Sequence, residues 1–434
     1  MKNILNLGNV CSLETILFNS PDSNKPISRS INLYRKLNIL MKNFNPKNLK
    51  TYFLTMVSLI KIFFLIKKKI IKNKQIKVLM FYFPLKSYNE NIINLENILK
   101  KNKNLLILLI YNKYSKDELL KQKNSYLLDF GYLRFVPFSN IFLNKIDLFI
   151  SAYGTYVFPP NSKNIFINHD IADTPMVNEE IEKKLFLFFF SKIHFIFLSS
   201  DIVIKDFIKK IKFYFAETKF KSPKLINTGY LKLDHVRRKL ELINNKKDSI
   251  LLAPTSSSML KNLNMSNDLI NVIDNLLNKT KNKIIFRPHP LDLTKKGNIN
   301  YVTNIVNKFK NYKNFKVDLS NSYLNSYSKA RFLVTDFSGT AYTFAFSTLR
   351  PVIFYSKNEE NLIKTKYKNL LYFRDRQQIG YISKNIPHFI KLVNKFNLTN
   401  KEMERKIFIL RKKRIKYLNK SLKKTRDEIL KILK

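Results

Sequence analysis

The sequence alternates short, strongly apolar runs with longer stretches that mix polar and apolar residues. The runs are apolar at successive positions rather than at every second one, which is typical of strands in a parallel sheet covered on both faces. The stretches between them have the length of helices, so the pattern predicts βαβ units. The first series is IKVLMFYF, LLILLIY, IDLFISA, NIFINH and HFIFLSS; the second is ILLAP, KIIFRPHP, FKVDLS, RFLVTDFS and RPVIFYS.

A polar, charged passage at residues 229–249, GYLKLDHVRRKLELINNKKDS, separates the two series. Such a passage suits a connection between domains. We therefore predict an α/β fold with two Rossmann-like, doubly wound domains, residues 76–240 and 249–400, facing each other across a cleft. Residues 1–75 are expected to form a helical, basic extension, and residues 401–434 a tail of basic amphipathic helices.

Two segments raise the question of a membrane. The apolar stretch from Tyr52 to Ile66 is interrupted by Lys61 and is shorter than the roughly 20 residues that span a bilayer. A buried helix and a monotopic membrane contact both fit it. The basic tail likewise suits packing against the domains, binding to an anionic membrane, or both on opposite faces. The amino terminus lacks the pattern of a secretory signal, so we expect a cytosolic protein.

Composition narrows the possible partners. The 434 residues carry 79 Lys and Arg against 31 Asp and Glu, a net charge of +48. This charge favours nucleic acid, anionic lipid or an anionic substrate, although lysine, asparagine and isoleucine are abundant throughout, as AT-rich codon usage would produce. No nucleic-acid-binding motif is evident, so no nucleic-acid partner is expected. A single cysteine, Cys11, excludes an internal disulfide framework and a multi-cysteine metal site. We predict neither a metal nor a cofactor.

Polar clusters follow four of the predicted strands. They contain His169, Thr255 to Ser258, Arg287 to His289, and Asp336 to Thr340. Ligands of doubly wound sheets bind at the carboxyl ends of the strands. We therefore expect these clusters to form the binding site.

The RPHP cluster combines a fixed cation with a titratable group. Two prolines restrict the loop around His289, Arg287 can neutralise a phosphate bidentately, and His289 can exchange a proton near neutral pH. A histidine that only caps the following helix is the alternative.

The segment DFSGT resembles a phosphate-binding turn. After the strand ends, SGT opens a helix, so the backbone N–H groups of Ser338, Gly339 and Thr340 would lie at a helix amino terminus, which binds phosphate. Only 7 glycines occur in the chain, and Gly339 leaves room for a phosphate. Ser338 and Thr340 as simple helix caps remain an alternative. Asp336 is expected to orient the loop rather than to bind a cation.

Three motifs together resemble the CDP-glycerol glycerophosphotransferase family, the enzymes of teichoic acid and related polyol-phosphate polymers. RPHP is followed about forty residues later by VTDFSGTAYTFAFSTLRPVIFY; ILLAPT is similar to the family's first strand and turn of the nucleotide-binding domain; and NTGYLKLD resembles its Gly-x-x-(Arg/Lys)-x-Asp segment. The resemblance runs from about Ile146 to Arg374. The chain departs from the family in having Asp170 after His169 and serines 256–258 after APT.

The resemblance implies a GT-B fold, in which residues 249–400 bind the nucleotide donor and residues 76–240 the acceptor. It also implies His169 and His289 as the two catalytic histidines, with Arg287 facing phosphate. Donor contacts are expected from Thr255, Asp336, Ser338, Gly339 and Thr340.

The sequence thus predicts a transferase that moves a glycerol-phosphate or similar unit from CDP-glycerol, or a comparable nucleotide-activated donor, to a glycan or lipid-linked acceptor. It would act on the inner face of the cell membrane, as a peripheral protein on an anionic surface. A GT-B glycosyltransferase that uses a nucleotide sugar for capsule or lipooligosaccharide synthesis is the alternative.

Overall fold

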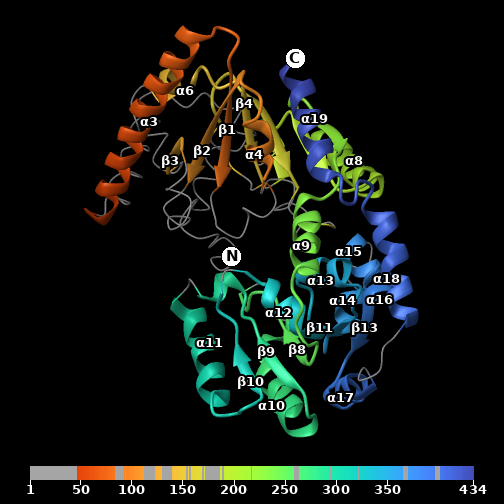
Figure 1. The fold of residues 1–434 in the computed structure, drawn as a ribbon. Helices are drawn as coiled ribbons and strands as arrows, with labels where there is room; N and C mark the ends of the chain where they lie inside the picture. Colours follow the sequence, from red (N-terminus) through yellow and green to blue (C-terminus); the bar gives the residue numbers. More distant parts are fainter. Residues whose placement is uncertain are drawn as a thin grey trace. The chain divides into compact units, whose positions relative to one another are not determined.

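The computed structural model describes residues 46–83, 92, 94–111, 123–129, 139–152, 155, 158–168, 171, 186–187, 190–216, 218–258, 263–293, 296–320, 322–364, 370–395 and 401–434. The side chains of residues 46–49, 296–298 and 362–364 are not described. The chain divides into two compact units (Figure 1). The first comprises residues 1–169, 177–231 and 420–434, and the second residues 170–176 and 232–419.

The first unit is built on a seven-stranded sheet in which all paired strands are parallel. The strand order is β3-β2-β1-β4-β5-β6-β7. In the inner strands nearly every position is buried, because helices cover both faces, whereas the edge strands β3 and β7 are mostly half-buried. The strands are β1 (Lys77–Phe83), β2 (Leu105–Tyr111), β3 (Ser125–Leu127), β4 (Leu148–Ser151), β5 (Lys163–Ile167), β6 (Phe195–Leu198) and β7 (Lys224–Asn227).

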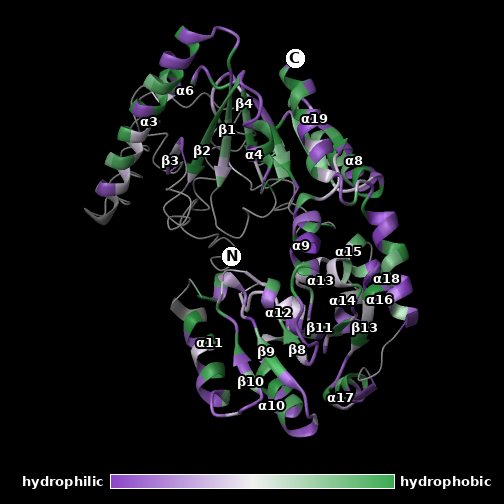
Figure 2. Ribbon diagram, in the orientation of Figure 1, coloured by the Kyte–Doolittle hydropathy of each residue, from purple (hydrophilic) through white to green (hydrophobic). Residues whose placement is uncertain are grey.

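Alternate residues of β1 and β2 enter two separate cores. One core packs against α4 (Leu95–Leu99) and α19 (Ser421–Leu433), and the other against α3 (Pro46–Lys72) and α6 (Ser139–Leu143). The helix α8 (Asp201–Phe215) is capped at its amino end by Ser200, whose hydroxyl accepts the N–H of Val203 at 3.3 Å. In Figure 2 these helices carry both hydrophobic and hydrophilic residues, as amphipathic helices on a sheet should.

The second unit contains a six-stranded parallel sheet of order β10-β9-β8-β11-β12-β13. This order reverses direction between β8 and β11, the point where doubly wound sheets bind ligands beyond the strand ends. The strands are β8 (Ser249–Leu252), β9 (Lys283–Phe286), β10 (Phe315–Val317), β11 (Ala330–Thr335), β12 (Val352–Tyr355) and β13 (Gly380–Ser383).

Helices cover both faces of this second sheet. On one face, α10 (Leu269–Lys279), α11 (Lys296–Phe309) and α17 (Ile386–Lys395) pack into a single apolar core. On the other, α12 (Leu324–Lys329) contacts β8, and α13 (Thr340–Thr348) contacts β11. Shorter helices complete the unit: η3 (Met265–Asn267), η4 (Pro290–Leu293), α14 (Glu359–Lys364), α15 (Leu371–Arg374) and α16 (Arg376–Ile379).

The basic tail forms two helices that belong to different units. The first, α18 (Lys401–Arg414), stays in the second unit: Arg411 donates to the carbonyl of Phe346 at 2.7 Å, and Arg414 pairs with Asp375 in the interior. Asp234 on α9 (Leu231–Glu241) then accepts the N–H of Asn419 at 2.7 Å. The second helix, α19, packs in the first unit. Buried pairing of both arginines shows that part of the tail's charge serves folding.

The predicted fold class is confirmed: both units are parallel α/β sheets of the doubly wound type, and the tail is helical. All ten predicted runs contain strands. The short strands β3, β7 and β13 were not predicted, because each has only three or four residues and little apolar character. None of the described helices has the length and apolarity required to cross a membrane.

Candidate active site

The carboxyl ends of β9, β8 and β11 meet at one edge of the second sheet. Because these three strands are direct neighbours, the loops that follow them lie side by side. They carry Arg287 and His289, Thr255, and the segment 336–340. Seven of the eight sequence-predicted site residues therefore lie at this edge, within one unit. His169 lies outside the described residues.

Asp336 anchors the loop that follows β8. Its buried carboxylate accepts the backbone N–H groups of Thr255 at 2.9 Å, Met265 at 3.1 Å and Phe337 at 2.7 Å. Burial raises the pKa of Asp336, while these N–H donors oppose the rise. The Asp336 carboxylate thus binds backbone groups. The N–H of Thr255, which donates to it, is not available to a ligand.

A second buried carboxylate, Asp292, holds the serine segment of the same loop. It accepts the hydroxyl of Ser256 at 2.8 Å, the hydroxyl of Ser257 at 3.0 Å, and the N–H of Ser257 at 3.1 Å. Asp292 also donates its own N–H to the carbonyl of His289 at 2.9 Å. It therefore joins the β8 loop to the RPHP loop.

The hydrogen bonds of His289 determine its tautomer. Its Nδ1 accepts the backbone N–H of Leu291 at 3.2 Å, and because a backbone N–H can only donate, Nδ1 carries no proton. The neutral ring must then carry its proton on Nε2. Burial lowers the pKa of His289, and the negative charge of Asp292 partly offsets that effect. Near neutral pH, His289 is a neutral imidazole that offers Nε2–H as a donor.

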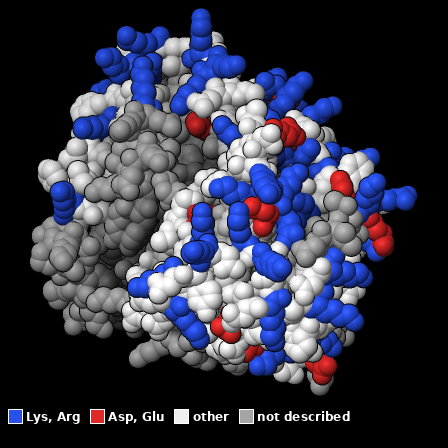
Figure 3. All heavy atoms as spheres, turned by 60° about the horizontal axis from the view of Figure 1, so that its bottom comes forward, with Lys and Arg blue, Asp and Glu red and all other residues white. Residues whose placement is uncertain are grey.

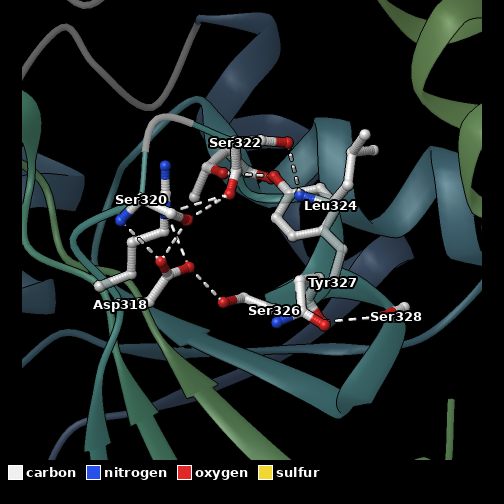
Figure 4. Close-up of polar contacts among 10 residues, drawn as sticks. Asp318, Ser320, Ser322, Leu324, Ser326, Tyr327 and Ser328 are labelled. Atoms are coloured by element: carbon white, nitrogen blue, oxygen red, sulfur yellow. Dashed lines mark hydrogen bonds and ion pairs between the residues drawn. The ribbon is translucent and has the colours of Figure 1, made fainter.

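Arg287 is held by one of its nitrogens. Nη1 lies 2.7 Å from Asp318 Oδ2 and also contacts Ser320 Oγ at 3.5 Å and the Ser322 carbonyl at 3.4 Å. Figure 4 shows the Asp318 carboxylate among the serines that surround it. Among the described residues, Nη2 and Nε of Arg287 make no hydrogen bond. The guanidinium is thus oriented and retains one edge for an anion.

The amino end of α13 has the form expected for SGT. Gly339 occupies the N-cap position with φ −57° and ψ −18°, and because glycine has no side chain, the helix has no side-chain cap at that residue. The Thr340 hydroxyl bonds instead to Tyr327 Oη at 2.5 Å, and the Ser338 carbonyl accepts Tyr372 Oη at 2.9 Å. Gly339, rather than Ser338 or Thr340, thus occupies the N-cap position.

This edge can bind an anion through three kinds of donor: a guanidinium edge, an imidazole N–H and the free N–H groups of a helix terminus. Such donors suit a phosphate or pyrophosphate. In the part of the chain that the structure describes, no group of three or more His, Cys, Asp or Glu side chains has the arrangement of a metal site.

Two important residues, Asp292 and Asp318, were not singled out from the sequence. Asp318 follows the strand FKV, so it satisfies the same strand-end criterion that selected Asp336. Asp292 lies within η4 and carries no such signal; only its contact with Ser256 and Ser257 identifies it.

Solved structures of known proteins share this architecture. The wall teichoic acid polymerase TagF, in a form soaked with CDPG, matches with a TM-score of 0.58 at 14% identity, covering 94% of this chain and 98% of that one. A UDP-GlcNAc 2-epimerase from Methanocaldococcus jannaschii matches with a TM-score of 0.52 at 14% identity, covering 77% and 99%. A putative 2-epimerase from Listeria monocytogenes gives 0.54 at 12%, covering 82% and 95%. At these identities the likeness concerns the fold, which is of the GT-B kind.

Comparison with curated proteins gave no match. The sequence model of one family does match: CDP-glycerol:poly(glycerophosphate) glycerophosphotransferase, over residues 221–430. That range contains every described residue of the candidate site. Over residues 221–430, the chain therefore matches the CDP-glycerol:poly(glycerophosphate) glycerophosphotransferase family of transferases.

Proposed function

We propose that this transferase moves a glycerol-phosphate or similar polyol-phosphate unit from CDP-glycerol, or a close CDP-linked relative, to a hydroxyl of a lipid-linked or cell-surface glycan acceptor. The observation that carries the proposal is the sheet edge of the second unit. There Arg287, His289 and the amino end of α13 supply three kinds of anion donor within the segment that matches the family. The TagF structure with CDPG has a similar fold.

The reaction would be a displacement at phosphorus. The acceptor oxygen attacks the phosphate that bears glycerol, the bond from that phosphorus to the bridging oxygen breaks, and CMP leaves with the bonding electrons. The acceptor hydroxyl loses its proton to a base. Positioning and charge stabilisation dominate such reactions. Arg287 and the N–H groups at Ser338 to Thr340 would stabilise the negative charge on the pyrophosphate.

The tautomer of His289 assigns it a role. Nδ1 is occupied by the Leu291 N–H and Nε2 is protonated, so the neutral ring donates a hydrogen bond rather than removing a proton. We therefore propose that His289 contacts the donor phosphate or the departing CMP. The base that deprotonates the acceptor is then another group, for which His169 is the candidate.

The nucleotide-sugar alternative has weaker support. The 2-epimerases that resemble this chain have the same kind of fold, but only at 12–14% identity. The family match favours the polyol-phosphate transferase instead.

An anionic membrane is the proposed partner surface, and α3 supports it. Phe53, Ile60, Phe64 and Ile71 are exposed by 41–72%. Because each helical residue turns by about 100°, these four lie within about 20° of one line along α3. The neighbouring lysines 61, 67 and 68 are exposed. An apolar stripe flanked by cations is typical of an interfacial helix. We propose peripheral binding to the inner face of the cell membrane.

The decisive experiment compares donors. Purified protein is incubated with a lipid-linked polyol-phosphate acceptor and CDP-glycerol, CDP-ribitol or a panel of nucleotide sugars, and nucleotide release is measured. CMP release that depends on acceptor supports the proposal. Release from a nucleotide sugar alone would replace it with the glycosyltransferase. His289→Ala should abolish release while remaining folded, and a folded variant with wild-type turnover would remove His289 from the mechanism.

A further inference from the structure

The short helix α12 connects the two phosphate contacts proposed above. Two consecutive residues of α12 point to different partners. Ser326 donates its hydroxyl to the Asp318 carboxylate, which binds Arg287. Tyr327 bonds through its hydroxyl to Thr340 at the amino end of α13. One rigid turn of helix therefore touches both the Arg287 side and the α13 side of the candidate site.

The Asp318 side of this connection is dense with hydrogen bonds. The carboxylate accepts the N–H of Ser320 at 2.9 Å, the hydroxyls of Ser320 and Ser326, and Nη1 of Arg287. These contacts lower the pKa of Asp318 against the opposing effect of burial, so the group stays ionised and can hold the guanidinium. In Figure 4, Ser326 points to Asp318, whereas Ser328 makes its contact elsewhere.

The Tyr327 side is equally well fixed. Tyr327 is 1% exposed, and its ring lies 5.1 Å from that of Phe344 on α13 and 4.6 Å from that of Tyr323. Its carbonyl accepts Arg350 Nη1 at 3.0 Å. Tyr323 in turn lies 6.0 Å from the Arg287 guanidinium. The tyrosine pair thus reinforces the link between Arg287 and α13.

We propose that α12 is a spacer that sets the separation between the Arg287 guanidinium and the amino end of α13, with Asp318, Ser326 and Tyr327 as positioning residues for one bound pyrophosphate. This inference rests on the proposed function. None of the three residues needs to touch the donor. Their effect passes through Arg287 on one side and Thr340 on the other.

The chain offers a matched pair of serines to test the spacer. Ser326 and Ser328 are both on α12 and are 3% and 4% exposed. Ser328 donates to Asn325 at 2.8 Å and accepts from Asn245 at 2.6 Å, with no contact to Asp318. Ser326→Ala and Ser328→Ala therefore remove similar hydroxyls, but only the first affects Arg287. Tyr327→Phe tests the other side, and its control is Tyr355→Phe, since Tyr355 is also buried but donates its hydroxyl to Asp268 at 3.3 Å.

The measurement is calorimetric affinity of the full chain for CDP-glycerol and, separately, for inorganic pyrophosphate. Ser326→Ala and Tyr327→Phe should each weaken both affinities about three- to tenfold, and the two controls should weaken neither. In an Arg287→Lys background, Ser326→Ala should have little further effect, because the guanidinium that Ser326 positions through Asp318 is gone, while Tyr327→Phe keeps its effect. This dependence separates positioning from a general loss of stability.

Several outcomes would overturn the spacer. If Ser326→Ala and Ser328→Ala lost equal affinity, the hydroxyls of α12 would matter only for folding. Full additivity of Ser326→Ala with Arg287→Lys would show that Ser326 does not act through Arg287. Wild-type protein that binds neither ligand overturns it as well. If wild-type binds pyrophosphate but not CDP-glycerol, the proposed donor fails, and the serine comparison with pyrophosphate still decides the spacer.

Discussion

At the scale of single residues, His289 has a pH-dependent effect on stability that can be measured. Its folded pKa lies below the ordinary value because burial disfavours the charged ring. The unfolded chain therefore binds more protons as the pH falls below about 6.5, and the free energy of unfolding must decrease there. The contribution of His289 is fully present above that pH and is lost on acidification toward the folded pKa.

The test uses His289→Asn, which keeps an acceptor close to the position of Nδ1. Urea unfolding at pH 7.5, 6.5 and 5.5 should show the stability advantage of wild type over the variant shrinking as the pH falls. The difference between the two proteins is the relevant quantity, because His194 also has a burial-lowered pKa and titrates in both. An advantage that grows on acidification would contradict the tautomer and pKa described for His289.

Gly339 gives a second residue-scale prediction. Its φ and ψ are those of an ordinary right-handed helix, so a valine there meets no forbidden backbone region. Gly339→Val should nevertheless weaken donor binding sharply, because its side chain occupies the place where a phosphate oxygen approaches. Ser338→Ala should have the smaller effect, since the backbone donors remain and one hydrogen bond is worth roughly 0.5–1.5 kcal/mol. Calorimetry measures both; a folded Gly339→Val with wild-type affinity would limit SGT to a structural role.

At the scale of elements, the edge strand β13 depends on Gly380. An added Cβ would lie 1.8 Å from the carbonyl oxygen of Val352, the residue paired with it on β12. Gly380→Ala must therefore separate the two strands locally, at a cost of roughly 1–3 kcal/mol. Thermal unfolding should show a lower melting temperature for Gly380→Ala than for Gly339→Ala, the same change at an exposed helix end. Equal melting temperatures would mean that β13 shifts freely.

The two helices of the tail show why an element's charge does not reveal its role. Arg411 and Arg414 on α18 are buried and pair with Phe346 and Asp375, while lysines 412 and 413 are exposed. The same helix thus uses some cations to dock onto the second unit and presents others to solvent. Only the tertiary contacts separate these two groups.

At the scale of the whole molecule, the net charge of +48 predicts salt-dependent binding to anionic surfaces. Figure 3 shows Lys and Arg far outnumbering Asp and Glu on the face in view. Each cation near an anionic membrane contributes about 1 kcal/mol, and the apolar stripe of α3 would add contact with the acyl boundary. We therefore expect sedimentation with anionic vesicles that weakens as salt rises.

Two equally exposed phenylalanines distinguish membrane contact through α3 from attraction by the overall charge. Phe53 on α3 and Phe213 on α8 are each 65% exposed. Phe53→Ser should reduce the vesicle-bound fraction, while Phe213→Ser should leave it unchanged. Equal binding to neutral and anionic vesicles would defeat the electrostatic part of the proposal. An equal loss in Phe213→Ser would defeat the part that assigns the contact to α3.

The sequence by itself determined the parallel α/β class and the strand-end positions of Thr255, Arg287, His289 and the segment 336–340. Both follow from local patterns: runs buried on both faces identify the strands, and polar residues directly after them mark the sheet edge. The helix at Thr340 was predictable for the same reason, since SGT precedes a helical apolar run.

Only the tertiary structure decided how those residues are held. Arg287 is oriented by Asp318, 31 positions away, because β9 and β10 are neighbours in the sheet. The β8 loop is anchored by Asp336, 81 positions from Thr255, because β8 lies beside β11. The tautomer of His289 depends on a turn geometry that no residue pattern encodes. Hydrogen-bond partners follow from strand order, which many weak long-range contacts set together, and local patterning cannot supply that order.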